Sequence, residues 1–208
     1  KGIEASLTVR PVQTKDWQVE VTGNFTYNKN EITELTGEAA MIKTGGINAG
    51  TGNQCQVHTV GKPASSFYVY QQVYGADGLP LEGVFVDRNN DGNISEEDRY
   101  CYKSPAAPYL AGLSARIQYK NWDLGFNLRG SFGNYVYNDR QADYANVAKR
   151  YDSSFACLQN TTPTAVKNNW KTYSWVLSDY YVENASFVKL DNITLGYSFQ
   201  NLFKGGSY

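Results

Sequence analysis

The chain has 208 residues and a formal net charge of −1 at pH 7, so no basic field predicts binding to nucleic acid. Apolar residues make up 41% and aromatic residues 14% of the sequence, with 19 glycines and one methionine. This composition is typical of an all-β chain. No apolar run reaches the roughly 18 residues of a transmembrane helix, so none is predicted.

Apolar and polar residues alternate at the start of the chain, as they do in strands with one apolar and one polar face. Residues 3–10 and 17–28 alternate, and residues 11–16 are expected to form the turn between them. We therefore predict a long hairpin. Its apolar face would carry Ile3, Ala5, Leu7, Val9, Trp17, Val19, Val21, Phe25 and Tyr27.

The next stretch, from residue 29 to about 66, is rich in Gly, Thr, Asn and Lys and has no periodicity, which predicts a long exposed loop. Residues 67–75 and 84–86 are expected to be short strands. Alternation then returns in residues 111–119 and 122–132, on either side of a very short turn at Lys120–Asn121. This pattern predicts a second long hairpin.

A second irregular stretch covers about residues 134–179, and a last alternating segment covers residues 183–199. In that segment Val188 and Leu190 are out of phase with Ile193 and Leu195. A shift of phase within one strand predicts a β-bulge, here near Asp191–Asn192.

An acidic turn occupies residues 83–99, with the sequence GVFVDRNNDGNISEEDR. Oxygen-bearing side chains at alternate positions, a glycine at the reversal and a closing carboxylate form a calcium-loop pattern. The candidate ligands are Asp87, Asn89, Asp91, Asn93 and Asp98. Asp98 replaces the usual bidentate Glu, and no flanking helices are predicted, so this is not an EF-hand. We predict a structural Ca²⁺ here; the alternative is an Asx/Gly turn without metal.

Two architectures fit the alternation: the wall of a transmembrane β-barrel and a β-sandwich. Two very short turns alternate with two long loops, as in outer-membrane barrels. Trp17 and Trp122 lie beside the short turns. Tyr27 follows Trp17, and Phe132 follows Trp122, by the length of a strand that crosses a bilayer, roughly 9–11 residues. We therefore predict an all-β antiparallel meander from a transmembrane β-barrel, a partial barrel with two long extracellular loops.

Four stretches together resemble the SusC/RagA type of TonB-dependent outer-membrane transporter found in Bacteroidetes. They are KGIEASLTVRPVQTKDWQVEVTGNFTYNKNEI, FVDRNNDGNISEEDR, YLAGLSARIQYKNWDLGFNLRGSFGNYVYN and ENASFVKLDNITLGYSF. The resemblance covers nearly the whole chain. It implies that residues 1–208 are the C-terminal portion of the receptor β-barrel, with about five membrane strands, and that the plug domain and the final strand are absent.

The resemblance also implies a function. Such transporters lie in the outer membrane of Gram-negative cells, with lipid around the barrel, and import oligosaccharides, peptides or similar nutrients. TonB supplies the energy through the missing N-terminal part, and a SusD-like surface lipoprotein covers the extracellular mouth. The competing hypothesis is a secreted, calcium-stabilised β-sandwich that binds glycans.

Aromatic residues of the second long loop are candidates for stacking on sugar rings or on a partner, and the alternative is packing within the loop. They are Trp170, Tyr173, Trp175 and Tyr180. No enzyme is predicted, because the single histidine, His58, stands beside no nucleophile motif. Three cysteines without a CxxC pair predict no zinc site, and free thiols are favoured over a Cys55–Cys101 disulfide.

Overall fold

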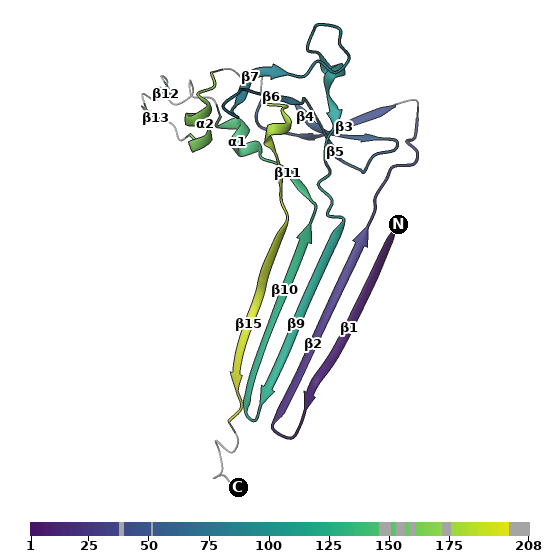
Figure 1. The fold of residues 1–208 in the computed structure, drawn as a ribbon, viewed down its shortest axis with the longest axis vertical. Helices are drawn as coiled ribbons and strands as arrows, with labels where there is room; N and C mark the ends of the chain where they lie inside the picture. The colour runs from purple at the N-terminus through teal and green to yellow at the C-terminus, as the bar shows by residue number, and fades with distance from the viewer. Residues whose placement is uncertain are drawn as a thin grey trace, which may run out of the picture. The chain divides into compact units, whose positions relative to one another are not determined.

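The computed structural model describes residues 1–37, 40–50, 52–145, 161–171 and 176–199, together with the backbone of two short strands at 151–152 and 157–158. The chain divides into two compact units, each built from segments that are distant in the sequence (Figure 1). The sheet unit comprises Lys1–Lys29, Ala107–Gly133 and Ser186–Tyr208. The loop unit comprises Asn30–Ala106 and Asn134–Ala185. Among the described residues, no helix is long and apolar enough to cross a membrane.

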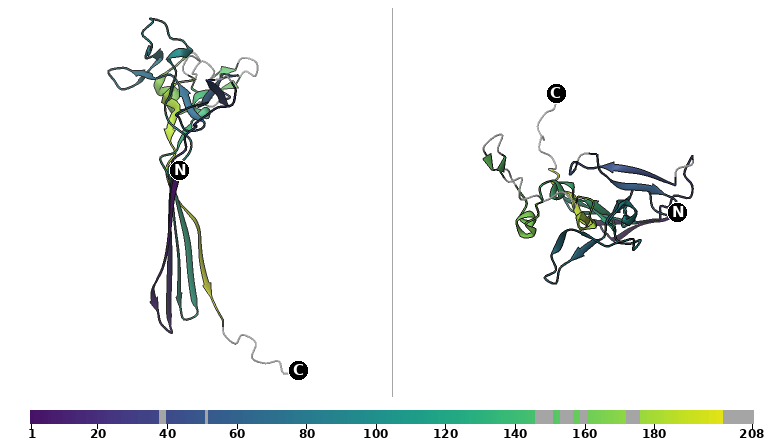
Figure 2. Two further views of the ribbon diagram at one scale, coloured as in Figure 1. Left: turned by 90° about the vertical axis from the view of Figure 1, so that its right-hand side faces the viewer. Right: turned by 90° about the horizontal axis from the view of Figure 1, so that it is seen from above.

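The sheet unit is one five-stranded antiparallel sheet in which the strands follow chain order, so it is a meander. Viewed edge-on, its strands form a single layer (Figure 2). The strands, in spatial order, are β1 (Gly2–Gln13), β2 (Trp17–Asn28), β9 (Tyr109–Tyr119), β10 (Trp122–Phe132) and β15 (Phe187–Tyr197). The predicted antiparallel meander is confirmed, and the barrel is not closed by these strands.

Local chemistry explains the two short connections. The Thr14 hydroxyl accepts a hydrogen bond from the Trp17 backbone N–H at 3.0 Å, which closes the turn between β1 and β2. Between β9 and β10, Lys120 adopts a φ of 50°, the left-handed conformation that a two-residue reversal requires. The Lys120 N–H donates to the Asp16 carbonyl at 2.8 Å, so the two turns support each other.

Two bulges interrupt the register. In β15 the pairing shifts between the partners of Asn127 and Leu128, which leaves Asp191 as the extra residue and confirms the predicted bulge. In β1 a second shift lies between Val9 and Val12. The prediction of a turn starting at Pro11 is wrong, because β1 continues to Gln13. A bulge can accommodate a proline, whose missing N–H would otherwise break the hydrogen-bond ladder.

The five strands give the sheet two chemically distinct faces, which we call the apolar face and the polar face. The register aligns the apolar side chains in rows across the sheet: Leu113 pairs with Leu128, and Leu7 lies in the same row on the other side of Gly23. These side chains are exposed: Leu7 by 68% and Leu195 by 69%. In a sandwich they would meet a second sheet, and the described residues of the sheet unit provide none. The sandwich hypothesis is therefore not supported.

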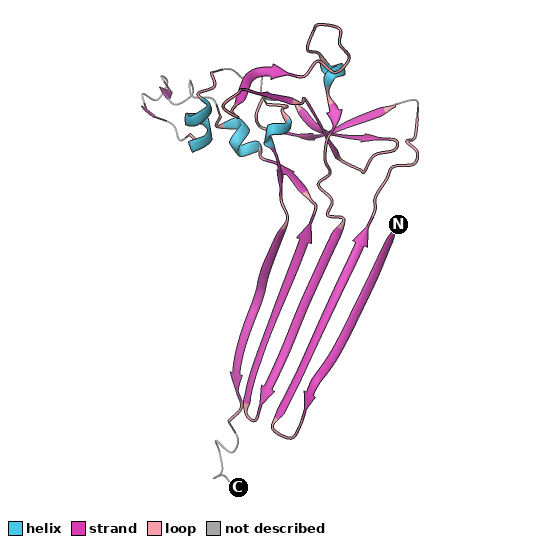
Figure 3. Cartoon of the chain, viewed as in Figure 1, coloured by secondary structure: helices cyan, strands magenta, loops and turns pink. Residues whose placement is uncertain are grey.

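The loop unit consists of short strands and single helical turns (Figure 3). Its four-stranded sheet contains β3 (Met41–Gly46), β4 (Gln54–Thr59), β5 (Ser66–Val69) and β8 (Tyr100–Cys101). The strand pairs are β6 (Gln72–Tyr74) with β7 (Pro80–Phe85), β11 (Tyr135–Tyr137) with β14 (Val182–Asn184), and β12 (Tyr151–Asp152) with β13 (Cys157–Leu158). The helical turns are η1 (Glu96–Asp98), α1 (Asp139–Asp143), α2 (Pro163–Asn168) and η3 (Asp179–Tyr181).

The loop unit has its own hydrophobic core, so the prediction of an exposed loop at residues 29 to about 66 is wrong, and the irregular stretch at about residues 134–179 contributes to the same core. Residues of both long excursions meet in this core: Ala49, Cys55, Phe67, Val69, Tyr137, Ala142, Ala145, Trp170, Val176, Leu177, Tyr181 and Val182. The predicted strand at residues 67–75 is split into β5 and β6, and the one at 84–86 overlaps only the end of β7. Because these apolar residues follow no period, the sequence pattern does not reveal that they converge.

A buried polar network joins the two excursions. The Ser178 hydroxyl donates to the side-chain carbonyl of Gln72 at 2.7 Å. The Asp179 carboxylate accepts from the Gln72 backbone N–H at 3.0 Å and from the Tyr100 hydroxyl at 2.7 Å. Burial and then the bond to Asp179 raise the pKa of Tyr100, which keeps its hydroxyl protonated as a donor.

The described cysteines are free thiols, as the sequence favoured. Burial raises the pKa of Cys55 to about 11, and Cys101 is half-buried and also unpaired. A buried, fully protonated thiol is a poor nucleophile and a poor metal ligand.

Candidate functional site

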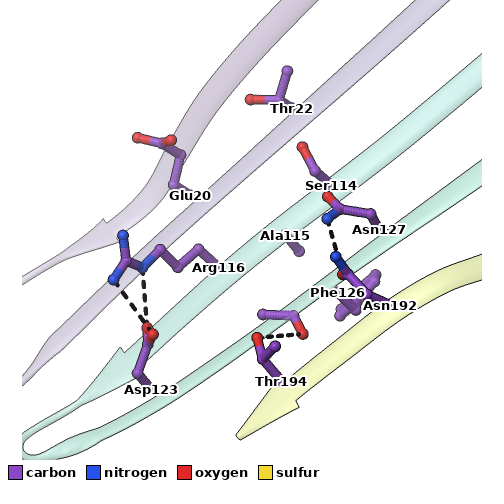
Figure 4. Close-up of a pocket in the computed structure, with 11 residues that line it drawn as sticks. Glu20, Thr22, Ser114, Ala115, Arg116, Asp123, Phe126, Asn127, Asn192 and Thr194 are labelled. Carbon is purple, nitrogen blue, oxygen red and sulfur yellow. Dashed lines mark hydrogen bonds and ion pairs between the residues drawn. The ribbon is translucent and has the colours of Figure 1, made fainter. Parts of the chain in front are cut away.

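The polar face of the five-stranded sheet carries a hollow of about 380 Å³ on β2, β9, β10 and β15 (Figure 4). Hydroxyls, amides and charged groups dominate its lining: Glu20, Thr22, Ser114, Arg116, Asp123, Asn127, Asn192 and Thr194. The side-chain amide of Asn127 on β10 donates to the side-chain oxygen of Asn192 on the adjacent strand β15 at 2.9 Å. Alternation on each strand places these groups on one side and the apolar groups on the other.

Ion pairs connect neighbouring strands across the polar face. Arg116 binds both oxygens of the Asp123 carboxylate, with N–O distances of 3.0 and 3.3 Å (Figure 4). Arg10 and Glu20 approach to 2.7 Å. These groups are substantially exposed, so the pairs contribute little to stability. Their presence indicates a face that is adapted to contact water and polar solutes.

A row of aromatic side chains runs across the sheet beside the short turns. Trp17 pairs with Tyr119, and the ring centroids are 4.3 Å apart. Trp122 pairs with Tyr119 on one side and with Tyr197 on the other, and its ring centroid lies 4.8 Å from that of Tyr197. Four strands thus contribute an aromatic residue at the same level.

A second aromatic row crosses the sheet at the other strand ends. Tyr27 pairs with Tyr109, which pairs with Phe132, and the Tyr27 and Tyr109 ring centroids are 5.2 Å apart. About ten residues at ~3.3 Å each separate the two rows, and a strand tilt of about 40° reduces that length to a height of about 25 Å. This is the height of the apolar band of a membrane barrel.

The acidic turn in the loop unit is held together by its own hydrogen bonds. The Asp87 carboxylate accepts from the backbone N–H groups of Asn90 at 2.7 Å and Gly92 at 2.8 Å. The Asn89 side chain accepts from the Asp91 N–H at 3.0 Å, and Asp91 in turn accepts from the Asn93 N–H at 2.7 Å. These are the bonds of the Asx/Gly turn.

Asp98 closes the turn as a fully buried carboxylate. One oxygen accepts from the Ser95 N–H at 2.8 Å and the other from the Arg88 N–H at 2.8 Å. Ser95 is also the N-cap of η1, and its side chain accepts from the Glu97 N–H. The backbone N–H of Ser95 and then that of Arg88 hold the pKa of Asp98 below its usual range.

The acidic turn is expected to loosen in acid. A folded-state pKa below the unfolded value means that Asp98 stabilises the turn above the unfolded pKa of about 3.9, and that this stability is lost as the pH falls through the folded pKa. Protection of residues 87–98 from hydrogen exchange in the full receptor, relative to the intrinsic rate at each pH, should therefore be high at pH 7 and fall below about pH 4. Asp98→Asn should give fast exchange at both pH values, whereas Glu97→Gln should resemble the wild type.

Calcium binding by this turn stays a prediction. Among the described residues, no three His, Cys, Asp or Glu side chains are placed to hold a metal ion. Carboxylate oxygens that accept one N–H keep a further lone pair for a cation. If Ca²⁺ binds, hydrogen exchange of residues 87–98 will be slower in CaCl₂ than in EGTA, and Asp91→Asn will remove the difference. Equal exchange in both buffers would favour the metal-free turn.

The four candidate aromatic residues of the second long loop do not share one environment. Trp170 is 2% exposed and packs against Tyr180 and Tyr181, so it belongs to the core and does not offer a stacking surface. Tyr180 is half-buried, and its hydroxyl accepts from the Asn168 side chain at 3.2 Å. Tyr173 and Trp175 lie outside the described residues. Binding by Tyr180 stays a prediction.

Comparison with known proteins gives matches along the whole chain, although no family model matches. The chain is 46% identical over 211 residues to the TonB-dependent receptor SusC of Bacteroides thetaiotaomicron, covering 100% of this chain and 21% of that protein. It is 24% identical over 226 residues to the TonB-dependent receptor P3 of Formosa agariphila, covering 99% of this chain and 22% of that receptor. The structure of the RagAB peptide transporter matches with a TM-score of 0.67 at 21% identity, over 99% of this chain and 24% of the matched chain.

A sheet with one apolar face, one polar face and an aromatic row at each end is a segment of a transmembrane β-barrel wall. The structural match shows the same fold. The chain belongs to the SusC/RagA type of TonB-dependent receptors, which are outer-membrane proteins. It spans about a fifth of the length of the curated relatives named above.

Proposed function

We propose that this chain forms part of the barrel wall of a TonB-dependent nutrient transporter. In this proposal the apolar face contacts lipid, the polar face lines the solute path, and the chain is the C-terminal portion of a longer receptor. The observation that carries the proposal is the pair of aromatic rows at the spacing of an apolar membrane band, with polar groups confined to the opposite face.

The solute is proposed to be an oligosaccharide, a peptide or a similar nutrient. RagAB is described as a peptide transporter, and the polar hollow offers hydroxyl, amide and guanidinium groups to such a solute. A SusD-like surface lipoprotein is the proposed partner at the extracellular side, and TonB the partner at the periplasmic side. No catalytic step is proposed.

The loop unit is proposed to be extracellular and the short turns periplasmic, because outer-membrane barrels have long external loops and short periplasmic turns. In a full receptor without native cysteines, Asn93→Cys in the acidic turn should react with a membrane-impermeant maleimide on intact cells. Lys120→Cys in the short turn should react only after lysis. Labelling of Lys120→Cys on intact cells would contradict the orientation.

Uptake tests the transport itself. Cells that lack the endogenous receptor are complemented with the full receptor and offered labelled oligosaccharides and peptides. We expect accumulation of at least one solute class that requires both the receptor and TonB. Accumulation that persists without TonB would indicate a passive pore and would contradict the proposal.

A further inference from the structure

Two like charges face each other on the polar face. Arg129 of β10 and Lys189 of β15 are direct register partners, so both side chains leave the same face of the sheet. Directly opposed like charges on neighbouring strands destabilise a sheet. A negative charge close to both side chains would offset this repulsion.

The sheet supplies only one carboxylate to this pair. Asp191, the residue inserted by the bulge, binds the Arg129 guanidinium at 3.1 Å, and Lys189 forms no ion pair with any described residue. Asp123 is engaged by Arg116. Glu4 lies on β1, four strands from β15 and thus about 19 Å away at ~4.8 Å per strand. One positive charge is therefore left uncompensated among the described residues.

Arg129 lines a hollow of about 550 Å³. Lys189 is outside the lining itself, but it is the register partner of Arg129 and lies two residues after Phe187, which does line the hollow. The hollow contains the large apolar side chains of this end of the polar face, Leu110 and Phe187, which are 43% and 42% exposed. The Arg129 guanidinium lies 5.8 Å from the centre of the Phe187 ring. Gly112, also in the lining, leaves room for the Asn24 side chain, because a Cβ there would come within 2.7 Å of it.

We propose that this hollow binds a solute that carries a carboxylate. The carboxylate would be held by Arg129 and Lys189, and the apolar part of the solute would pack on Phe187 and Leu110. Arginine is suited to this role, because its planar donors match a carboxylate even while one edge is used by Asp191. The inference rests on the proposed transport function, since it makes this hollow a point of contact along the solute path.

Two kinds of nutrient carry this chemistry: an acidic saccharide and the C-terminus of a peptide. Binding to the purified full receptor in detergent distinguishes them. The probes are trigalacturonate and its methyl ester, and a tripeptide with apolar side chains and the same tripeptide amidated at its C-terminus. We expect at least one acid to bind more tightly than its neutral counterpart by about tenfold, which corresponds to about 1.4 kcal/mol.

Matched variants assign the difference to this site. Lys189→Gln and Arg129→Gln should each abolish the preference for the acid, and Lys189→Arg should keep it and so show that the receptor remains folded. Arg10→Gln removes the same charge from the same face on β1, four strands from Lys189, and should leave the preference intact. Equal binding of acid and neutral probes, or loss of the preference in Arg10→Gln, would overturn the inference. Because binding needs no TonB, a receptor that binds the acid but fails to accumulate solute would contradict the transport function alone.

Discussion

Arginine in place of Leu7 is expected to destabilise the full receptor in a bilayer by about 2–4 kcal/mol, the cost of a cation on the lipid face near the membrane midplane. Leu7 is 68% exposed on the apolar face and lies midway along β1. The introduced arginine would project from the apolar face, so its charge would have to be accommodated by lipid. The change in the free energy of unfolding is measured by urea unfolding of the receptor in lipid vesicles, with heat-modifiable gel mobility as the readout of the folded fraction.

Ser6→Arg is the matched control, because Ser6 precedes Leu7 on the same strand and projects from the polar face. A barrel lumen hydrates an arginine, so the control should unfold within about 1 kcal/mol of the wild type. Equal destabilisation by the two substitutions would contradict the assignment of lipid-facing and lumen-facing sides. A larger effect at Ser6 would reverse it.

Trp170→Ala is expected to destabilise the loop unit by about 3–5 kcal/mol, as removal of a buried aromatic side chain does. Trp170 is 2% exposed and contacts the Tyr180 and Tyr181 rings in the core shared by the two excursions. Hydrogen exchange in the full receptor should accelerate at β5 and at η3, which lie in different excursions. The strands of the sheet unit should keep their protection.

Tyr74→Ala provides the control, because Tyr74 is an aromatic residue of the same unit that is 50% exposed. A substitution at such a surface position should change stability by no more than about 0.5 kcal/mol. If Trp170→Ala left exchange unchanged at β5, the two excursions would be independent loops rather than one packed unit.

The sequence was most informative about the strands of the sheet unit. The alternation that identifies β2, β9, β10 and β15 arises because each strand separates an apolar from a polar face, and a period of two is a local property of the chain. The bulge at Asp191 was predictable for the same reason, since a shift of phase is visible in one strand. The turn predicted at Pro11 was wrong because a second bulge carries β1 past the proline.

The loop unit shows where local patterns stop being informative. Its core residues follow no period, and residues as far apart as Phe67 and Tyr181 pack in one cluster. The burial of Trp170 follows from this convergence. An aromatic residue in an apparently polar loop therefore does not identify a binding surface.

The sequence by itself determined the class of strands, the two faces of the sheet, the aromatic rows and the family, because these depend on residue types at short, regular spacings. The tertiary structure alone decided which residues lie opposite each other. The register of β10 against β15 joins residues that are separated by a long excursion, so the pairing of Arg129 with Lys189 has no local signature. Contacts across such distances depend on how the chain packs, and they locate both the core of the loop unit and the proposed carboxylate site.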